Sequence, residues 1–247
     1  MNDALAGKRA LVTGGSRGIG AAIALALADN GADVALTFQN AADRAQEVVA
    51  SIEKLGRRGV AIQADMADPA AIRESVEAAV GALGGLEILV NNAAIARYNT
   101  IADFDAADLD ALLAVNVRGP VLATQAAMPH LKGGGRVITI GSAGADRIVG
   151  AQGTVYYMTK SALQSFTRGL AQELGPKDVT ANLVQPGSTD TEMNPADGES
   201  ADFQRSLTPL GRFAAPADIA AAVVFLASPA ARHVTGTIIT VDGGLLT

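Results

Sequence analysis

The stretch RALVTGGSRGIG, residues 9–20, decides the fold. Its first five residues suit a buried strand, and its glycines allow a tight turn in which the backbone approaches a ligand closely. An Ala-rich stretch typical of a helix, residues 18–30, follows directly. A strand, a glycine turn and a helix N-terminus form an anion cradle, because free N–H groups and the helix dipole favour negative charge. The stretch therefore predicts a dinucleotide-binding unit.

Short apolar runs and longer helical stretches alternate along the rest of the chain. Strands are expected at 9–13, 34–38, 60–64, 86–90, 136–140, 179–184 and 237–241. Helices are expected at 18–30, 41–55, from Pro69 onward, 105–131 with a break near Gly119-Pro120, 155–174 and 216–226. Apolar strands joined by helices predict right-handed crossovers and a parallel sheet. The expected fold class is α/β: a single-domain, doubly wound Rossmann fold over residues 1–247, with about seven parallel strands and helices on both faces.

Residues 188–215 show no expected element, which is long for a loop in a compact domain. The segment is expected to be a substrate lid or to be locally disordered, and the sequence leaves both open. It offers apolar side chains to line a pocket, namely Met193, Phe203, Leu207, Leu210 and Phe213. Its acidic residues are expected on a solvated surface, and they are Asp190, Glu192, Asp197, Glu199 and Asp202.

The composition excludes several classes of function. The 247 residues are 49% hydrophobic and contain no cysteine, so disulfides, thiolate metal sites and a cysteine nucleophile are excluded. His130 and His233 are too few and too far apart to predict a metal site. A net charge of −6 and the absence of tryptophan disfavour a nucleic-acid partner. The apolar runs 19–28 and 219–227 fall short of a membrane span, and no export signal is visible, so a soluble, cytoplasmic protein is expected.

Several further motifs follow the glycine turn in a fixed order. They are Thr13-Gly14-x3-Gly18-x-Gly20, Asn91-Asn92-Ala93-Ala94, Asn116, Ser142, Tyr156-x3-Lys160, Pro186-Gly187 and Val241-Asp242-Gly243-Gly244. In this order and spacing the chain resembles the short-chain dehydrogenase/reductase family over nearly its whole length. The resemblance implies a nicotinamide dinucleotide cofactor held by Gly14, Ser16, Arg17, Gly18, Ile19, Gly20, Asp65, Met66, Asn92, Ala93, Tyr156, Lys160, Gly187, Thr189 and Thr191.

The cofactor is expected to be NADP(H) rather than NAD(H). An NAD-specific fold usually carries an acidic residue at the end of the second strand, on the ribose hydroxyls. That position is Phe38, followed by Gln39 and Asn40, so no carboxylate would repel a 2′-phosphate. The Arg17 guanidinium in the loop is suited to pair with such a phosphate. A solvated surface charge is the alternative for Arg17, and a turn residue is the alternative for Asp65.

Tyr156 and Lys160 stand four apart in an expected helix, so they share one face. A tyrosine hydroxyl can donate a proton, and a nearby ammonium is expected to lower its pKa toward the working range. Tyr157 has a permitted spacing to Lys160 as well, but the resemblance selects Tyr156. Ser142 ends a strand at the ligand-binding edge, where its hydroxyl would orient a substrate oxygen; an ordinary turn serine is the alternative.

The resemblance further implies that Asn116 holds a water in a proton relay from Lys160; the alternative is a polar group that stabilises a helix irregularity. In the family the serine more often precedes the tyrosine by thirteen residues, whereas Ser142 precedes Tyr156 by fourteen. The departure puts the shape of the loop in doubt more than the serine.

The expected function is reversible reduction of a ketone or 3-oxo group to a secondary alcohol, with no metal. A 3-oxoacyl-carrier-protein reductase and a broad ketone reductase both stay open. A polyanionic carrier would need a basic patch, for which the candidates are Arg97, Arg118 and Arg147. The alternative function is a catalytically silent sensor or scaffold that binds a dinucleotide. A small-molecule substrate and no membrane partner are expected, and the resemblance implies a homotetramer.

Overall fold

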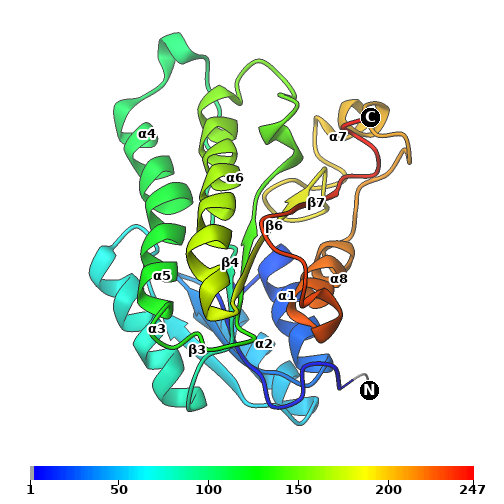
Figure 1. Ribbon diagram of the computed structural model, residues 1–247. Coiled ribbons are helices and arrows are strands. Elements are labelled where there is room, and N and C mark those ends of the chain that lie inside the picture. Colours follow the sequence, from blue (N-terminus) through cyan, green and yellow to red (C-terminus); the bar gives the residue numbers. More distant parts are fainter. Residues whose placement is uncertain (1–2) are drawn as a thin grey trace.

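The computed structural model describes residues 3–247. In this part of the chain, seven strands form one sheet in the order β3-β2-β1-β4-β5-β6-β7, and every neighbouring pair is parallel. The strands are β1 (Arg9–Val12), β2 (Asp33–Phe38), β3 (Gly59–Gln63), β4 (Ile88–Asn91), β5 (Arg136–Ile140), β6 (Thr180–Pro186) and β7 (Ile238–Val241). The doubly wound α/β fold predicted from the sequence is confirmed (Figure 1).

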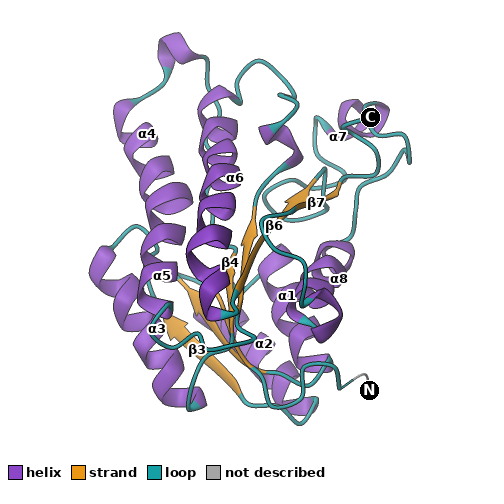
Figure 2. Ribbon diagram, viewed as in Figure 1, coloured by secondary structure: helices purple, strands orange, loops and turns teal. Residues whose placement is uncertain are grey.

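Helices cover both faces of this sheet (Figure 2). They are α1 (Gly18–Asp29), α2 (Ala42–Lys54), α3 (Pro69–Leu83), α4 (Ala106–Leu113), α5 (Gly119–Ala127), α6 (Thr154–Leu174), α7 (Ala201–Ser206) and α8 (Pro216–Ala227). Helices α1, α2 and α8 pack on one face, and α3, α5 and α6 pack on the other. Figure 1 shows α4 continuing the line of α5 beside α6.

Two apolar cores lie between the sheet and these helix layers. Successive residues of β1 point to opposite cores: Ala10 and Val12 belong to the core under α1, α2 and α8, whereas Leu11 belongs to the core under α3, α5 and α6. All three are fully buried. This alternation explains why the strand sequences are apolar without interruption, because both faces of each central strand are covered.

The stretch expected as one helix over 105–131 is divided by a π-helical turn, η2 (Ala114–Arg118), between α4 and α5. The observed irregularity therefore directly precedes the break expected near Gly119-Pro120. Pro120 has no backbone N–H and blocks the regular ladder of the turn that precedes it, so the irregularity appears on its N-terminal side.

The segment 188–215 contains a helix, α7, so the expectation that it holds no regular element was wrong for residues 201–206. Six residues are too short to show a helical period, and packing within the segment stabilises this turn instead. The ends of the segment lie together, because Thr189 and Ala214 form an isolated parallel bridge.

The strand order of the sheet reverses between β1 and β4. Strands β2 and β3 lie on one side of β1, and β4 to β7 lie on the other. Ligands of open α/β sheets bind at the carboxyl ends of the strands beside this switch point. The loops after β1, β4, β5 and β6, which carry most of the predicted site residues, meet at that edge. None of the described helices is both long and apolar enough to cross a bilayer.

Candidate active site

The loop after β1 is tied to the loop after β4. Thr13 Oγ1 accepts the backbone N–H groups of Asn92 and Ala93, both at 3.0 Å. The Asn92 side-chain amide in turn donates to the carbonyls of Thr13 and Gly14, at 2.9 and 3.0 Å. Gly14 and Gly18 both have positive φ angles, of 66° and 53°, so the turn uses the freedom that only glycine has at low cost. These hydrogen bonds fix the position of the turn against the loop after β4.

The N-terminus of α1 faces this loop without a side-chain cap. Its N-cap residue, Arg17, is extended and makes no capping hydrogen bond through its side chain, and the first turn has no acidic residue. The first N–H groups of the helix and the positive end of its dipole are therefore available to an anion. A pyrophosphate fits this chemistry.

At Gly20 the first turn of α1 packs closely against the Gly14 backbone and the Asn92 side chain. A Cβ atom at Gly20 would lie 2.2 Å from the Gly14 carbonyl oxygen and 2.5 Å from Asn92 Nδ2. These partners are a backbone atom and a hydrogen-bonded amide, so neither yields cheaply. At Gly14 itself, a Cβ would lie 2.9 Å from Ala93 Cα. The glycines keep the cradle open for a cofactor.

We expect Gly20→Ala to lower the free energy of unfolding by about 1–3 kcal/mol and to weaken dinucleotide binding, because the new methyl group displaces the Gly14 turn. Gly81→Ala is the matched control, since Gly81 is an exposed residue of α3 with nothing within 4 Å of its Cβ position. Denaturant titration of both variants measures the difference. Equal stability of Gly20→Ala and the wild type would show that the loop can widen.

Tyr156 and Lys160 lie in the first two turns of α6. Lys160 is 3% exposed, and its Nζ donates to the carbonyl oxygen of Ile140, the last residue of β5, at 3.1 Å. The same nitrogen is 5.9 Å from the centre of the Tyr156 ring. The predicted pair therefore shares one face of the helix, at the carboxyl edge of the sheet.

Ser142 follows β5 and begins the short 3-10 turn η3 (Ala143–Ala145). Its Oγ accepts the N–H of Gly144 at 3.2 Å, which leaves the hydroxyl proton free for another partner. The turn rests on α6, because Ser161 Oγ donates to the Ala145 carbonyl at 3.0 Å. A Cβ at Gly144 would lie 2.0 Å from the Tyr157 ring, so glycine is required for this contact. The serine is thereby fixed against the helix that carries Tyr156.

Asn116 lies in the π turn and is 1% exposed. Its amide donates to the Ile95 carbonyl at 2.9 Å and to Thr159 Oγ1 at 3.1 Å, and its Oδ1 accepts the Ile95 N–H at 2.9 Å. Thr159 Oγ1 donates to the Tyr156 carbonyl at 2.6 Å. Asn116 thus joins the loop after β4 to α6, and one lone pair of Oδ1 remains for a water. Its relay role stays a prediction.

Burial raises the pKa of Tyr156 above its ordinary value, and the nearby Tyr98 and Tyr157 raise it further. This direction is opposite to the expectation that Lys160 lowers it. Burial also lowers the pKa of Lys160 to about 8, and its amine is directed to a backbone carbonyl, so it acidifies the phenol little in this structure. Tyr156 is therefore protonated across the neutral range and has a proton to donate, but its raised pKa makes it a weaker acid than an ordinary phenol.

Two further tyrosines surround Tyr156. The Tyr98 ring is 5.6 Å and the Tyr157 ring 5.3 Å from it, measured between ring centres. Tyr98 is 55% exposed, and burial of the rest of the side chain, with a smaller effect of Tyr157, raises its pKa to about 12. Tyr157 Oη donates to the Val149 carbonyl at 3.3 Å. Sequence reasoning missed Tyr98, because it lies in a loop with no motif.

At the end of β2 the structure shows Phe38 buried in the core and no carboxylate in the strand end. Arg17 Nη1 instead pairs with Glu192 of the segment 188–215, at 3.0 Å. Arg44, in the first turn of α2, pairs with the same carboxylate. Sequence reasoning missed Arg44. Glu192 is exposed, as the sequence predicts for the acidic residues of this segment. The sequence did not predict that its carboxylate bridges two cations.

The remaining predicted cofactor residues lie at the same edge. Asp65 Oδ1 accepts the Ala67 N–H at 2.8 Å, so its carboxylate has the turn role given as its alternative, and it is exposed. Met66 is buried beside it. Gly187 approaches the loop after β7, where a Cβ would lie 2.6 Å from the Asp242 Cα. Thr191 covers the glycine turn, with its methyl 3.4 Å from the Cβ position of Gly18.

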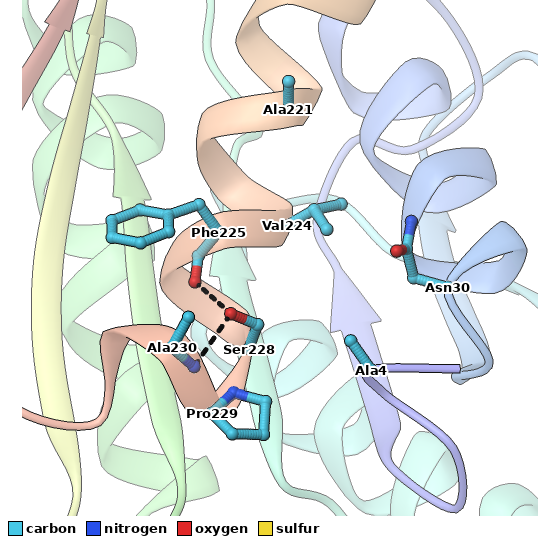
Figure 3. Close-up of a pocket in the computed structure, with 8 residues that line it drawn as sticks. All are labelled: Ala4, Asn30, Ala221, Val224, Phe225, Ser228, Pro229 and Ala230. Atoms are coloured by element: carbon cyan, nitrogen blue, oxygen red, sulfur yellow. Dashed lines mark hydrogen bonds between the residues drawn. The ribbon is translucent and has the colours of Figure 1, made fainter. Parts of the chain in front are cut away.

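A separate pocket lies away from these residues, between the N-terminal segment, the end of α1 and the end of α8 (Figure 3). It is lined by Ala4, Asn30, Ala221, Val224, Phe225, Ser228, Pro229 and Ala230. Ser228 Oγ bridges the helix end by donating to Phe225 O and accepting from Ala230 N, so its polar atoms are used. No predicted site residue lines this pocket. Across residues 3–247, no cluster of three or more His, Asp or Glu side chains is arranged to hold a metal ion.

The chain is similar to several known proteins over nearly its whole length. A family model described as Enoyl-(Acyl carrier protein) reductase matches residues 14–246. The chain is 53% identical to a short-chain dehydrogenase from Burkholderia cenocepacia J2315 solved with NADP, with 98% of this chain and 99% of that chain covered and a TM-score of 0.97. It is 38% identical to L-rhamnose 1-dehydrogenase (NAD(P)(+)) of Sphingomonas sp. strain SKA58, over 98% of this chain and 97% of the relative. It is also 39% identical to the cyclic-di-GMP-binding biofilm dispersal mediator protein of Escherichia coli K12, over 97% and 98%.

Proposed function

The chain belongs to the short-chain dehydrogenase/reductase family, and on that premise we propose that it is an NADP(H)-dependent oxidoreductase that reversibly reduces a ketone or 3-oxo group to a secondary alcohol. The observation that carries the proposal is a half-buried, protonated Tyr156 on the same helix face as Lys160, at the edge where the glycine cradle opens. A scaffold that only binds a dinucleotide needs the cradle but not this pair.

The residues present fit the cofactor. The Gly14–Gly20 turn and the uncapped α1 N-terminus would hold the pyrophosphate, and Arg17 with Arg44 would hold a 2′-phosphate. The NADP-bound Burkholderia structure supports this preference. A reduced nicotinamide bound there supplies the hydride. The other residues proposed to contact the cofactor are Ser16, Ile19, Asp65, Met66, Asn92, Ala93, Gly187, Thr189 and Thr191.

Each catalytic side chain has a distinct task in the proposal. Ser142 Oγ uses its free hydroxyl proton to orient the substrate oxygen. Tyr156 Oη donates its proton to that oxygen as negative charge develops on it. Lys160 holds the ribose and restores the proton on Tyr156, and a water on Asn116 Oδ1 connects Lys160 to solvent. The carbonyl becomes a secondary alcohol, and the reverse order of proton steps oxidises it.

The rim of the site favours an apolar carbonyl substrate. Large apolar side chains from three loops at this edge are at least half-exposed, namely Tyr98, Ile101, Ile148, Met193 and Phe203. Exposed apolar side chains of this kind suit a hydrophobic ligand. Of the apolar residues expected to line the segment 188–215, Phe213 is instead buried at 9% exposure.

A free small molecule fits better than a carrier-bound acyl group. Arg97 pairs with Asp108 at 3.2 Å, so its charge is offset. Arg118 donates to the Ala67 carbonyl at 2.7 Å, and Arg147 donates to the Leu245 carbonyl, which directs both guanidinium groups toward their own chain. Of the three arginines that a polyanionic carrier would need, Arg97 is offset by a carboxylate, and only Arg118 and Arg147 remain without an ion pair among the described residues.

The test is a panel of apolar ketones, 3-oxo esters and aldehydes, assayed by loss of NADPH absorbance. We expect turnover of at least one apolar ketone, with a Michaelis constant for NADPH at least roughly tenfold below that for NADH, because the 2′-phosphate pairs with two cations. Product chirality would define the face of hydride attack. Tight NADPH binding without turnover of any carbonyl would favour the sensor or scaffold function, and a preference for NADH would contradict the cofactor assignment.

A further inference from the structure

The ion pairs of Glu192 occupy the position that the proposed function reserves for a 2′-phosphate. Arg17 comes from the loop after β1, and Arg44 comes from the first turn of α2, just after the end of β2. These two loops straddle the point where the ribose of a dinucleotide lies in this fold. Glu192 lies 148 residues after Arg44 and 175 residues after Arg17; its Oε1 binds Arg44 and its Oε2 binds Arg17.

The contact is specific to Glu192 among the acidic residues of its segment. Asp202 pairs with Arg205 inside α7, and Asp190 accepts the Ala196 N–H at 2.9 Å. Glu199 is exposed, and no ion pair of it is found among the described residues. Glu192 alone reaches across to the cofactor edge, and Arg17 and Arg44 lower the pKa of its carboxyl group, so it is ionised at neutral pH.

The backbone beside Glu192 explains why it reaches this point. Thr191 lies over Gly18, with its methyl 3.4 Å from the Cβ position of that glycine. Thr191 also pairs with Asn194 in a small bridge, which turns the chain back and leaves Glu192 at the tip. The carboxylate therefore lies above the cradle, on the side of β2.

We infer that Glu192 is a specificity-determining residue: its carboxylate competes with the 2′-phosphate of NADP(H) for Arg17 and Arg44, and so sets how strongly the protein prefers NADP(H) over NAD(H). This inference rests on the proposed function, because it assigns the two arginines to the cofactor. A carboxylate and a phosphate bind a guanidinium through the same pair of N–H donors, so both cannot hold the same donors at once. A cofactor without the 2′-phosphate does not need the arginines and leaves Glu192 in place.

The expected result follows from this competition. Glu192→Gln should tighten NADPH binding roughly two- to tenfold, because an amide is a weaker competitor and exposed ion pairs are individually weak. NADH binding should stay within about twofold. Adenosine 2′,5′-bisphosphate and ADP repeat the comparison without the nicotinamide, and only the former should bind more tightly. Glu199→Gln removes the same charge from the same segment and should change none of the four affinities.

Fluorescence titration and calorimetry measure these affinities without any turnover, and Glu192→Ala provides a second variant of the same position. Unchanged NADPH affinity, an equal gain for NADPH and NADH, or weaker NADPH binding in the Glu192 variants would each overturn the inference. The wild type separates the two proposals. If it binds neither dinucleotide, the proposed function fails; if it binds NADPH and the variants match it, only the role of Glu192 fails.

Discussion

Tyr156→Phe is expected to lower kcat for carbonyl reduction roughly 10²- to 10⁴-fold, the range for loss of a positioned general acid. The phenol is the group that burial keeps protonated at the site, so its removal leaves the developing alkoxide without a donor. Among the described residues, no hydrogen bond to Tyr156 Oη is found, so the substitution breaks no structural contact of that oxygen. The fold and the NADPH affinity should therefore stay close to those of the wild type.

Tyr157→Phe is the matched control, because it removes a hydroxyl from the adjacent residue. Its ring lies 5.3 Å from that of Tyr156, and its hydroxyl donates only to the Val149 carbonyl. We expect kcat within a few-fold of the wild type and a loss of about 1 kcal/mol in the free energy of unfolding. Steady-state assays and NADPH titrations of both variants make the comparison. A Tyr156→Phe enzyme that kept most of its activity would require another proton donor.

The glycine cradle could be predicted from the sequence because its cause is local. Gly14 and Gly18 adopt positive φ angles in the turn that the sequence indicates, and Gly20 fits only without a side chain. The alternation of apolar runs and helical stretches likewise fixed the element order, since each strand of a parallel sheet must be followed by a crossover. Asn116 illustrates an intermediate case: it lies in an irregular turn, as its alternative role predicts, and its relay role stays a prediction.

Long-range pairing could not be predicted. The Arg44–Glu192 ion pair joins residues 148 positions apart, and no spacing rule connects a helix residue to the tip of a distant turn. The prediction that Lys160 lowers the pKa of Tyr156 was wrong for a related reason. The four-residue spacing places Lys160 beside it, but the direction of the shift depends on how deeply both groups are buried and on the tyrosines that surround them. Burial is a property of the packed fold, which a local motif does not contain.

Lys160→Met is expected to reduce kcat roughly 10²- to 10³-fold and to weaken NADPH binding, because it removes the cation proposed to hold the ribose and to restore the proton on Tyr156. Methionine has nearly the same length as lysine and suits a side chain that is 3% exposed. The variant loses one hydrogen bond, from Nζ to the Ile140 carbonyl. It also no longer buries a charge, so we expect it to fold and to be at least as stable as the wild type at pH 7.

The pH dependence of stability gives a readout that is independent of activity. Burial lowers the pKa of Lys160 in the folded protein to about 8, from an ordinary value of 10.5. Between these two values the unfolded chain binds more protons at this residue than the folded protein does. The contribution of Lys160 to the free energy of unfolding is therefore unfavourable below pH 8 and becomes less so as the pH rises toward 10.5. Lys160→Met removes this rise.

Denaturant titrations of the wild type and Lys160→Met from pH 6.5 to 10 should thus show a stability difference that shifts toward the wild type as the pH increases. Lys177→Met serves as the control, because Lys177 is exposed in the turn after α6. Its difference from the wild type should not change through the same window. A pH-independent difference for Lys160→Met would mean that its amine is solvated in the folded protein. In that case burial would not lower the pKa of Lys160, and the pH dependence derived from it would be wrong.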